Sequence, residues 1–261
     1  MYILLWVIYM QKNQKFCSDD DFKKAAIRAI EFKSEIERKI ESYQNNSLLT
    51  KITMSIGGIS KMKRQGFHVA IRPSHYISCI LPFSNPHYSL NDMQPAFADP
   101  YLTIRGNFQI YNQHDAKEEL AEIGRLNNVT ASYIKNNNQS HHDLARYCTI
   151  DGFPFFIPLE GKNRVDLFRR HSQSIHVMLT VTKYPRSHEL CIIKARPFGI
   201  YYLHHKNKRG VNVEPLAFPS VSIPILKCYG VHECDFTPFW LSSYLEWRRS
   251  RNRVTSSQMR S

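Results

Sequence analysis

A chain of 261 residues with 43% hydrophobic side chains, 15 Phe and 14 Tyr can bury a large core, which excludes a wholly disordered protein. Its formal net charge of +13 favours a polyanionic partner, such as nucleic acid. The 6 cysteines form no C-x-x-C pair, so the sequence predicts neither a disulfide framework nor a metal site, and a reducing cytoplasm fits. Several are expected to be small core residues because they lie in apolar runs: Cys79, Cys148 and Cys191.

The chain begins with an apolar stretch, MYILLWVIYM. A membrane-spanning helix needs about 20 apolar residues, so this stretch is too short to cross a bilayer. It also lacks the positive start and small-residue cleavage site of a secretory signal. The sequence therefore predicts no membrane partner, and it leaves open whether Met1 or Met10 is the true start.

A long helix is predicted to begin at Ser18, whose hydroxyl can cap its first turn. The aspartates at 19–21 suit the positive end of the helix dipole, and apolar residues then recur at helical spacing as far as Tyr43. This helix belongs to residues 1–98, a helical and extended region whose role the sequence leaves open. Core packing, docking of a protein partner and self-association are all compatible with it.

The next segments favour extended structure. Residues 51–83 are rich in Ile and Val and broken by Gly and Pro, which is typical of strands. The Pro, Asn and Asp content of 84–100 predicts a loop, and a domain boundary is placed there. A strand or hairpin is expected over 101–112, at the start of a second domain that runs from 99 to 236. An amphipathic helix should follow over 114–126, with three residues facing inward: Leu120, Ile123 and Leu126.

A hairpin signal follows in RYCTIDGFPFFIPLEG, where two apolar runs flank Asp151 and Gly152, a pair that tight turns prefer. Pro154 indicates that the second strand lies at a sheet edge or begins late. A short helix at 164–171 and then strands are expected, and 214–231, which contains three prolines, is expected to wrap over the core. Residues 237–261 are expected to form a basic C-terminal helix and tail. The fold class is therefore α+β.

The hairpin delivers the chain to Gly161, Lys162, Asn163 and Arg164, at the start of the short helix. A glycine lets the backbone turn sharply and lets a ligand approach closely. Backbone N–H groups, a lysine charge and the planar fork of an arginine are together suited to a phosphate. These four residues are predicted to bind phosphate. The alternative is a solvated basic helix start with no ligand.

The order strand, Gly-x-Asn-Arg corner, helix, strand resembles the ParB/sulfiredoxin-like superfamily. The resemblance extends over 101–182 and is specific only within 147–182, where it rests on residues of the two strands and the corner: Phe155, Phe156, Gly161, Asn163, Arg164, Ile175 and Val177. It implies a mixed sheet with flanking helices, a nucleotide such as CTP or ATP with Mg²⁺, and a nuclease or NTPase of a plasmid, phage or other mobile element.

The chain departs from the family pattern at several positions. Sulfiredoxins carry a catalytic cysteine in this corner, where the present chain has Lys162 and Asn163, so sulfinic-acid reduction is not expected. Proteins of the ParB type carry a further arginine where this chain has Asp166. Neither their Glu-Asn-x-x-Arg helix nor a helix-turn-helix is visible downstream, so a CTP-driven DNA clamp is not implied.

For an enzyme, the candidate catalytic carboxylates are Glu160 and Asp166, because either could hold Mg²⁺ or act as a base beside a phosphate. Taken alone, each of these carboxylates is more often a surface or capping residue than a catalytic one. A second basic region is predicted to bind nucleic acid, with Tyr184, Tyr201 and Tyr202 available to stack on bases. Its candidate residues are Lys183, Arg186, Lys206, Lys208 and Arg209. A protein that binds nucleic acid without turnover and a protein-interaction module are the alternative functions.

Overall fold

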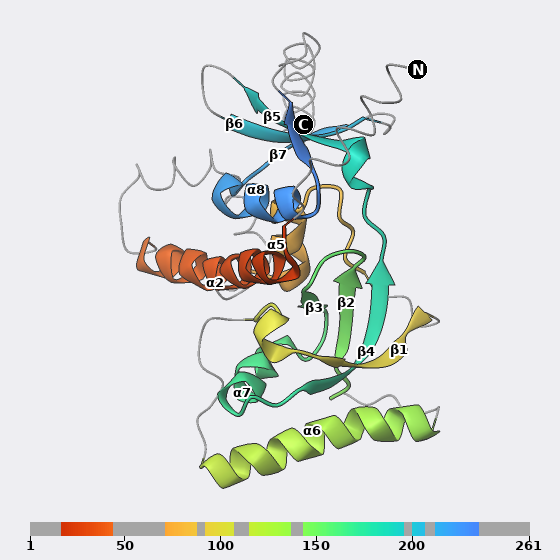
Figure 1. The fold of residues 1–261 in the computed structure, drawn as a ribbon. Coiled ribbons are helices and arrows are strands. Elements are labelled where there is room, and N and C mark those ends of the chain that lie inside the picture. The colour runs from red at the N-terminus through yellow and green to blue at the C-terminus, as the bar shows by residue number, and fades with distance from the viewer. Residues whose placement is uncertain are drawn as a thin grey trace, which may run out of the picture.

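The computed structural model describes seven stretches of the chain and places them in a mixed α+β fold (Figure 1). The described stretches are 17–43, 71–87, 92–106, 115–136, 143–195, 200–206 and 212–234. The predicted α+β class is confirmed. The family-specific arrangement implied by the resemblance stays a prediction. In the described part of the chain, no helix combines the length and apolarity that a membrane crossing requires.

One 4-stranded sheet has the strand order β1-β4-β2-β3. The central strands β4 and β2 are parallel, with Tyr147 opposite Leu179, whereas both outer pairs are antiparallel. The four strands are β1 (Gln94–Ala98), β2 (Arg146–Ile150), β3 (Phe156–Pro158) and β4 (Ile175–Thr182).

A second 4-stranded sheet has the order β7-β6-β5-β8, in which only the β5–β8 pair is parallel. Its strands are β5 (Leu190–Ala195), β6 (Ile200–His205), β7 (Val213–Pro215) and β8 (His232–Cys234).

Helices fill the space between the sheets and cover the outer face of the first one (Figure 1). α6 (Ala116–Asn136) and α7 (Val165–Arg170) pack on one face of the first sheet, around Tyr147, Phe168 and Val177. The opposite face shares a larger core with α2 (Asp19–Tyr43), α5 (Pro73–Ile80), α8 (Pro219–Cys228) and residues of the second sheet. Short 3₁₀ turns complete the order: η2 (Pro100–Leu102), η3 (Lys162–Arg164) and η4 (Ser187–Glu189).

The helices with a clear apolar repeat form as predicted. The Asp21 N–H donates to the Ser18 hydroxyl at 3.2 Å, which confirms the cap of α2. In α6, Ile123 and Leu126 are 5% and 4% exposed, as predicted. The prediction for Leu120 is wrong, because its side chain is 49% exposed. Glu119, one position earlier, takes the inward place and is only 6% exposed.

The hairpin and its edge position are confirmed. β2 and β3 pair antiparallel with Thr149 opposite Phe156, and β3 is the last strand of its sheet. The connection is longer than a two-residue turn, since β2 ends at Ile150 and β3 begins at Phe156. Pro154 lies in this connection, where its missing N–H interrupts no ladder.

One segment predicted to be extended is the helix α5, and the segment predicted to wrap over the core contains the helix α8. In α5, Pro73 occupies the first turn, and Tyr76, Ile77 and Ile80 are buried along one face. In α8, Pro219 again starts the helix. Proline is favoured at this position, because the first N–H groups of a helix have no partner within it. Both segments therefore begin with a residue that suits a helix start. Their Ile and Val content favours strands, and Pro224 lies inside α8, where proline is unfavourable.

β1 lies within 84–100, which was predicted to be a loop. Its position at a sheet edge explains how it accommodates Pro95. The strand expected from residue 101 begins instead as η2, followed by an isolated bridge between Thr103 and Phe156. The rest of that prediction, 107–112, lies outside the described residues, as do 1–10, 51–70 and 237–261.

The predicted boundary near residue 98 falls inside a shared structure. β1 pairs with β4 along its whole length, and α2 contributes Ala26, Ala29 and Ile30 to the core that also contains Ile225 of α8. The described residues on either side of the boundary therefore pack against each other.

The cysteines correct another expectation. Cys17 pairs with Cys228 and Cys191 pairs with Cys234, with Cα–Cα distances of 4.9 and 6.0 Å that suit disulfides. The first pair joins the start of α2 to the end of α8, and the second joins β5 to β8. Cys79 and Cys148 form no disulfide. Of the three cysteines predicted to be core residues, Cys148 and Cys191 are buried, whereas Cys79 is half-buried.

Candidate functional site: the Gly161–Arg164 corner

The corner between β3 and α7 depends on a left-handed glycine. Gly161 has φ +76° and ψ +11°, a conformation that residues with a side chain adopt only with strain. It reverses the chain into η3 and then α7, which has only 6 residues. Because these elements are so short, the side chains and local backbone of the corner must contribute most of any ligand binding.

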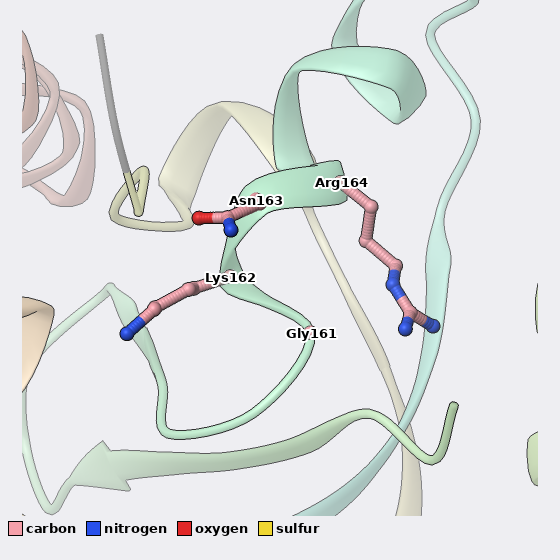
Figure 2. A pocket seen from close by; sticks show the side chains of 4 residues that line it. All are labelled: Gly161, Lys162, Asn163 and Arg164. Carbon is pink, nitrogen blue, oxygen red and sulfur yellow. The ribbon is translucent and has the colours of Figure 1, made fainter. Parts of the chain in front are cut away.

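The four predicted phosphate-binding residues line one cavity of about 230 Å³. The structure therefore brings Gly161, Lys162, Asn163 and Arg164 to a common space. Their cationic groups do not converge, however: Figure 2 shows the Lys162 ammonium and the Arg164 guanidinium extending to opposite sides. The two cations therefore cannot grip one phosphate together in this arrangement.

The Lys162 side of the corner packs tightly against the loop after η2. The Gly106 N–H donates to the Lys162 carbonyl at 3.1 Å. A β-carbon added at Gly106 would collide with the Asn163 side-chain oxygen and would lie 2.6 Å from Lys162 Cγ. The Gly106 carbonyl in turn accepts a hydrogen bond from the buried Lys33 ammonium of α2 at 3.3 Å. This side of the corner is therefore built into the core.

The Arg164 side has different partners. Arg164 Nη1 donates to the backbone carbonyl of Asp143 at 2.7 Å, and its Nη2 lies 3.3 Å from Asp143 Oδ1. The arginine side chain is 14% exposed, whereas the aspartate is 43% exposed. Arg164 is thus held at the surface by a carboxylate, the kind of group that a phosphate resembles in charge and geometry.

The two candidate catalytic carboxylates each face an arginine. Arg146 Nη1 donates to Glu160 Oε2 at 2.8 Å, and Arg105 Nε lies 2.9 Å from Asp166 Oδ1. Burial raises the pKa of the Asp166 carboxyl, and the positive charge of Arg105 opposes this shift. Within the described ranges, no three His, Cys, Asp or Glu side chains gather into a possible metal site. These observations favour ion pairing over metal binding for both carboxylates.

The second basic region is separate from the corner. Gly161 lies against Ala145, whose carbonyl accepts from the Met178 N–H in the middle of β4, whereas Lys183 and Arg186 follow the last residue of that strand. Both are exposed, as is Lys206, whose ammonium donates to the His188 carbonyl at 2.9 Å. Lys208 and Arg209 lie outside the described residues.

The tyrosines of this region are largely unsuited to base stacking, which corrects the prediction. Tyr184 and Tyr202 are each only 8% exposed. The Tyr184 hydroxyl donates to the Pro82 carbonyl at 2.8 Å, so this side chain is fixed in the core. Tyr201 is half-buried beneath the Lys194 ammonium, 5.4 Å from the ring centre. The region therefore offers exposed charge with little exposed aromatic surface.

Sequence reasoning missed Asp143 and Arg125, which complete the surroundings of Arg164. Arg125 Nη1 donates to Asp143 Oδ2 at 2.9 Å. Asp143 is the first described residue after a polar stretch, and Arg125 lies on the outward face of α6, so neither is marked by a motif. Only the tertiary structure brings the two side chains to Arg164.

No family model matches this chain, and neither a curated protein nor a solved structure matches it.

Proposed function

We propose that the chain binds a phosphate group at the Gly161–Arg164 corner, as part of a nucleotide or of a nucleic-acid backbone. The observation that carries the proposal is the single cavity of about 230 Å³ lined by all four residues of the corner. Sites for drug-sized ligands are commonly about 300–1,000 Å³. The cavity is therefore suited to a phosphate with part of its sugar, while the rest of the ligand would lie along the surface.

The surrounding chain supports this proposal. β3, the corner, α7 and β4 follow one another in the order that the resemblance to ParB/sulfiredoxin-like proteins implies. The net charge of +13 favours anionic ligands in general. A nucleoside triphosphate such as CTP or ATP in the cytoplasm is the ligand we propose to test first. Because Glu160 and Asp166 are paired with arginines, we propose binding without assigning a catalytic step or Mg²⁺.

A second candidate function is binding of nucleic acid without turnover. The exposed positive charges of Lys183, Arg186 and Lys206 favour it. Phosphate contacts of this kind release counterions, so the affinity for DNA should fall steeply as the salt concentration rises. A nucleotide bound in the corner should show a much weaker salt dependence, since it involves fewer phosphates.

The test is equilibrium binding of labelled CTP, ATP, and short single- and double-stranded DNA to the native chain and three variants. Arg164→Ala should weaken nucleotide binding by more than about tenfold, because a charge-assisted bidentate contact is lost. Lys162→Ala should weaken it by less, since its ammonium lies on the opposite side of the corner.

Lys183→Ala is the charge-matched control, because it also removes one positive charge but lies beyond the far end of β4. It should leave nucleotide affinity unchanged while weakening DNA binding. Circular dichroism of each variant checks that it folds. If folded Arg164→Ala binds CTP and ATP as the native chain does, or if the native chain binds neither at low salt, the phosphate site is not at this corner.

A further inference from the structure

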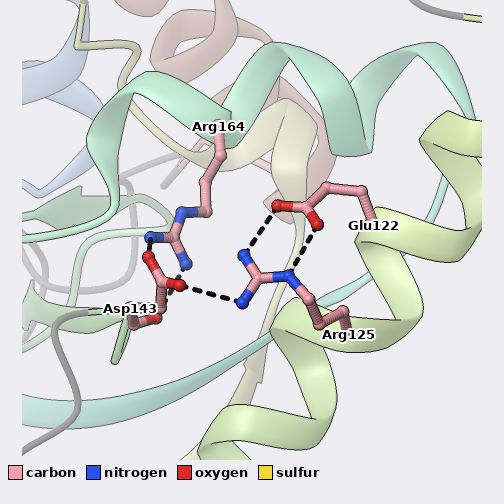
Figure 3. Close-up of polar contacts among 4 residues, drawn as sticks. All are labelled: Glu122, Arg125, Asp143 and Arg164. Atoms are coloured by element: carbon pink, nitrogen blue, oxygen red, sulfur yellow. Dashed lines mark hydrogen bonds and ion pairs between the residues drawn. The ribbon is translucent and has the colours of Figure 1, made fainter.

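A chain of alternating charges joins α6 to the corner (Figure 3). Arg125 donates to Glu122 through Nε at 2.7 Å and through Nη2 at 2.8 Å. It also donates to Asp143 Oδ2 at 2.9 Å, and the other oxygen of that carboxylate lies 3.3 Å from Arg164 Nη2. Two guanidinium groups from different elements thus converge on one carboxylate.

This convergence has the geometry of an oxyanion site. Arginine binds carboxylate and phosphate oxygens through the same planar fork of N–H groups. A phosphate can therefore replace a carboxylate that is held between two arginines. The central carboxylate is also accessible, because the Asp143 side chain is 43% exposed and that of Arg125 is 51% exposed. Arg164, at 14%, is the better fixed partner.

We propose, on the basis of the proposed function, that the Asp143 carboxylate binds Arg164 in the free chain, at the position that a phosphate would take. A phosphate group of the ligand replaces the Asp143 carboxylate between Arg164 and Arg125. Arg125 is then a second phosphate-contacting residue, and Asp143 is an internal competitor that sets the affinity of the corner.

Charge balance supports the exchange. Glu122, Arg125, Asp143 and Arg164 carry two negative and two positive charges, so the network is neutral before a ligand arrives. A phosphate adds about one and a half to two negative charges, and its repulsion with the Asp143 carboxylate favours departure of that side chain. The Asp143 backbone carbonyl, which accepts from Arg164 Nη1 at 2.7 Å, can keep the arginine in place during the exchange.

The experiment titrates inorganic phosphate, CTP and ATP into the full chain and its variants by calorimetry. Asp143→Asn keeps the shape and the backbone carbonyl but removes the competing charge. It should bind about three- to tenfold more tightly than the native chain, the effect expected from releasing about one partly exposed ion pair. Arg125→Gln should weaken binding several-fold.

Glu122→Gln is the matched control, because it removes the same charge from the same network and leaves Asp143 on Arg164. It should tighten binding by less than Asp143→Asn does, because the Asp143 carboxylate still competes for Arg164. If the native chain binds CTP through Arg164 but Asp143→Asn does not bind more tightly, or if Glu122→Gln tightens binding equally, the exchange is overturned and the proposed function stands. If native, Asp143→Asn and Glu122→Gln chains all fail to bind these phosphates, both proposals are overturned together.

Discussion

Two ion-pair regions border the corner, and they differ mainly in their access to water. Lys33 and Glu37 of α2 form a pair with both side chains 0% exposed, and the Lys33 ammonium also donates to the Gly106 carbonyl beside Lys162. On the other side, Arg164 pairs with an Asp143 side chain that is 43% exposed. The same chemistry therefore occurs once inside the core and once at the surface.

This difference in exposure to water determines which ion pair can exchange with a ligand. Burial lowers the pKa of Lys33, while the charge and hydrogen bond of Glu37 oppose that shift. Glu37 Oε1 also accepts from the Ile71 N–H at 2.7 Å, so removal of either partner would leave a buried group uncompensated. The Arg164–Asp143 pair can instead be replaced by water or by a dissolved anion. The buried pair is structural, and the exposed one is suited to binding.

The largest effect should follow from breaking the buried pair. Lys33→Met should lower the free energy of unfolding by about 3–5 kcal/mol, because it leaves the Glu37 carboxylate buried without its cation. The double variant Lys33→Met/Glu37→Met should recover part of that loss. Urea unfolding measures both. A loss below about 1 kcal/mol for Lys33→Met would show that water reaches Glu37 and that the two regions are alike.

The disulfide between Cys17 and Cys228 should also stabilise the packing of α2 against α8. Cys17 joins α2 to α8, and breaking a native disulfide costs about 2–4 kcal/mol, so a reductant should lower the midpoint of thermal unfolding. Alkylation of the unfolded chain, purified without reductant, should label only Cys79 and Cys148. Labelling of all 6 cysteines would rule out both disulfides.

The smallest effect on stability should come from the exposed network. Arg125→Gln should lower the free energy of unfolding by less than about 1 kcal/mol at pH 7, since exposed ion pairs contribute little. Hydrogen bonds from Arg125 lower the pKa of Glu122 below its ordinary value of 4.5. The stabilisation is therefore present above pH 4.5 and is lost as the pH falls through the lowered value. Urea unfolding at several pH values should show the native chain and the variant converging in acid.

Local patterns in the sequence were sufficient for part of this account. α2 could be predicted because Ser18 caps a long apolar repeat, and the hairpin because apolar runs flank Asp151 and Gly152. The corner could be predicted because glycine is needed where φ is +76°. In each case the cause of the structure lies within a few residues of its effect.

Tertiary effects account for what the sequence did not reveal. α5 and α8 contain β-branched residues that favour strands, and burial of one helical face against the core outweighs that preference. Asp143, the partner of Arg164, is 21 residues away in the sequence, and Arg125, which donates to that aspartate, is 39 residues away within α6. The divergence of Lys162 and Arg164 depends on the same packing, because Gly106 fills the Lys162 side.

The measurement that tests the central claim most directly is a titration of CTP, with ATP in parallel, into the ¹⁵N-labelled chain, followed by two-dimensional NMR. The account predicts saturable shifts of the backbone amides of Lys162, Asn163 and Arg164, together with the side-chain Nε–H of Arg164. If neither nucleotide shifts these signals, or if the shifts fall only around Lys183 and Arg186, the Gly161–Arg164 corner is not a phosphate site.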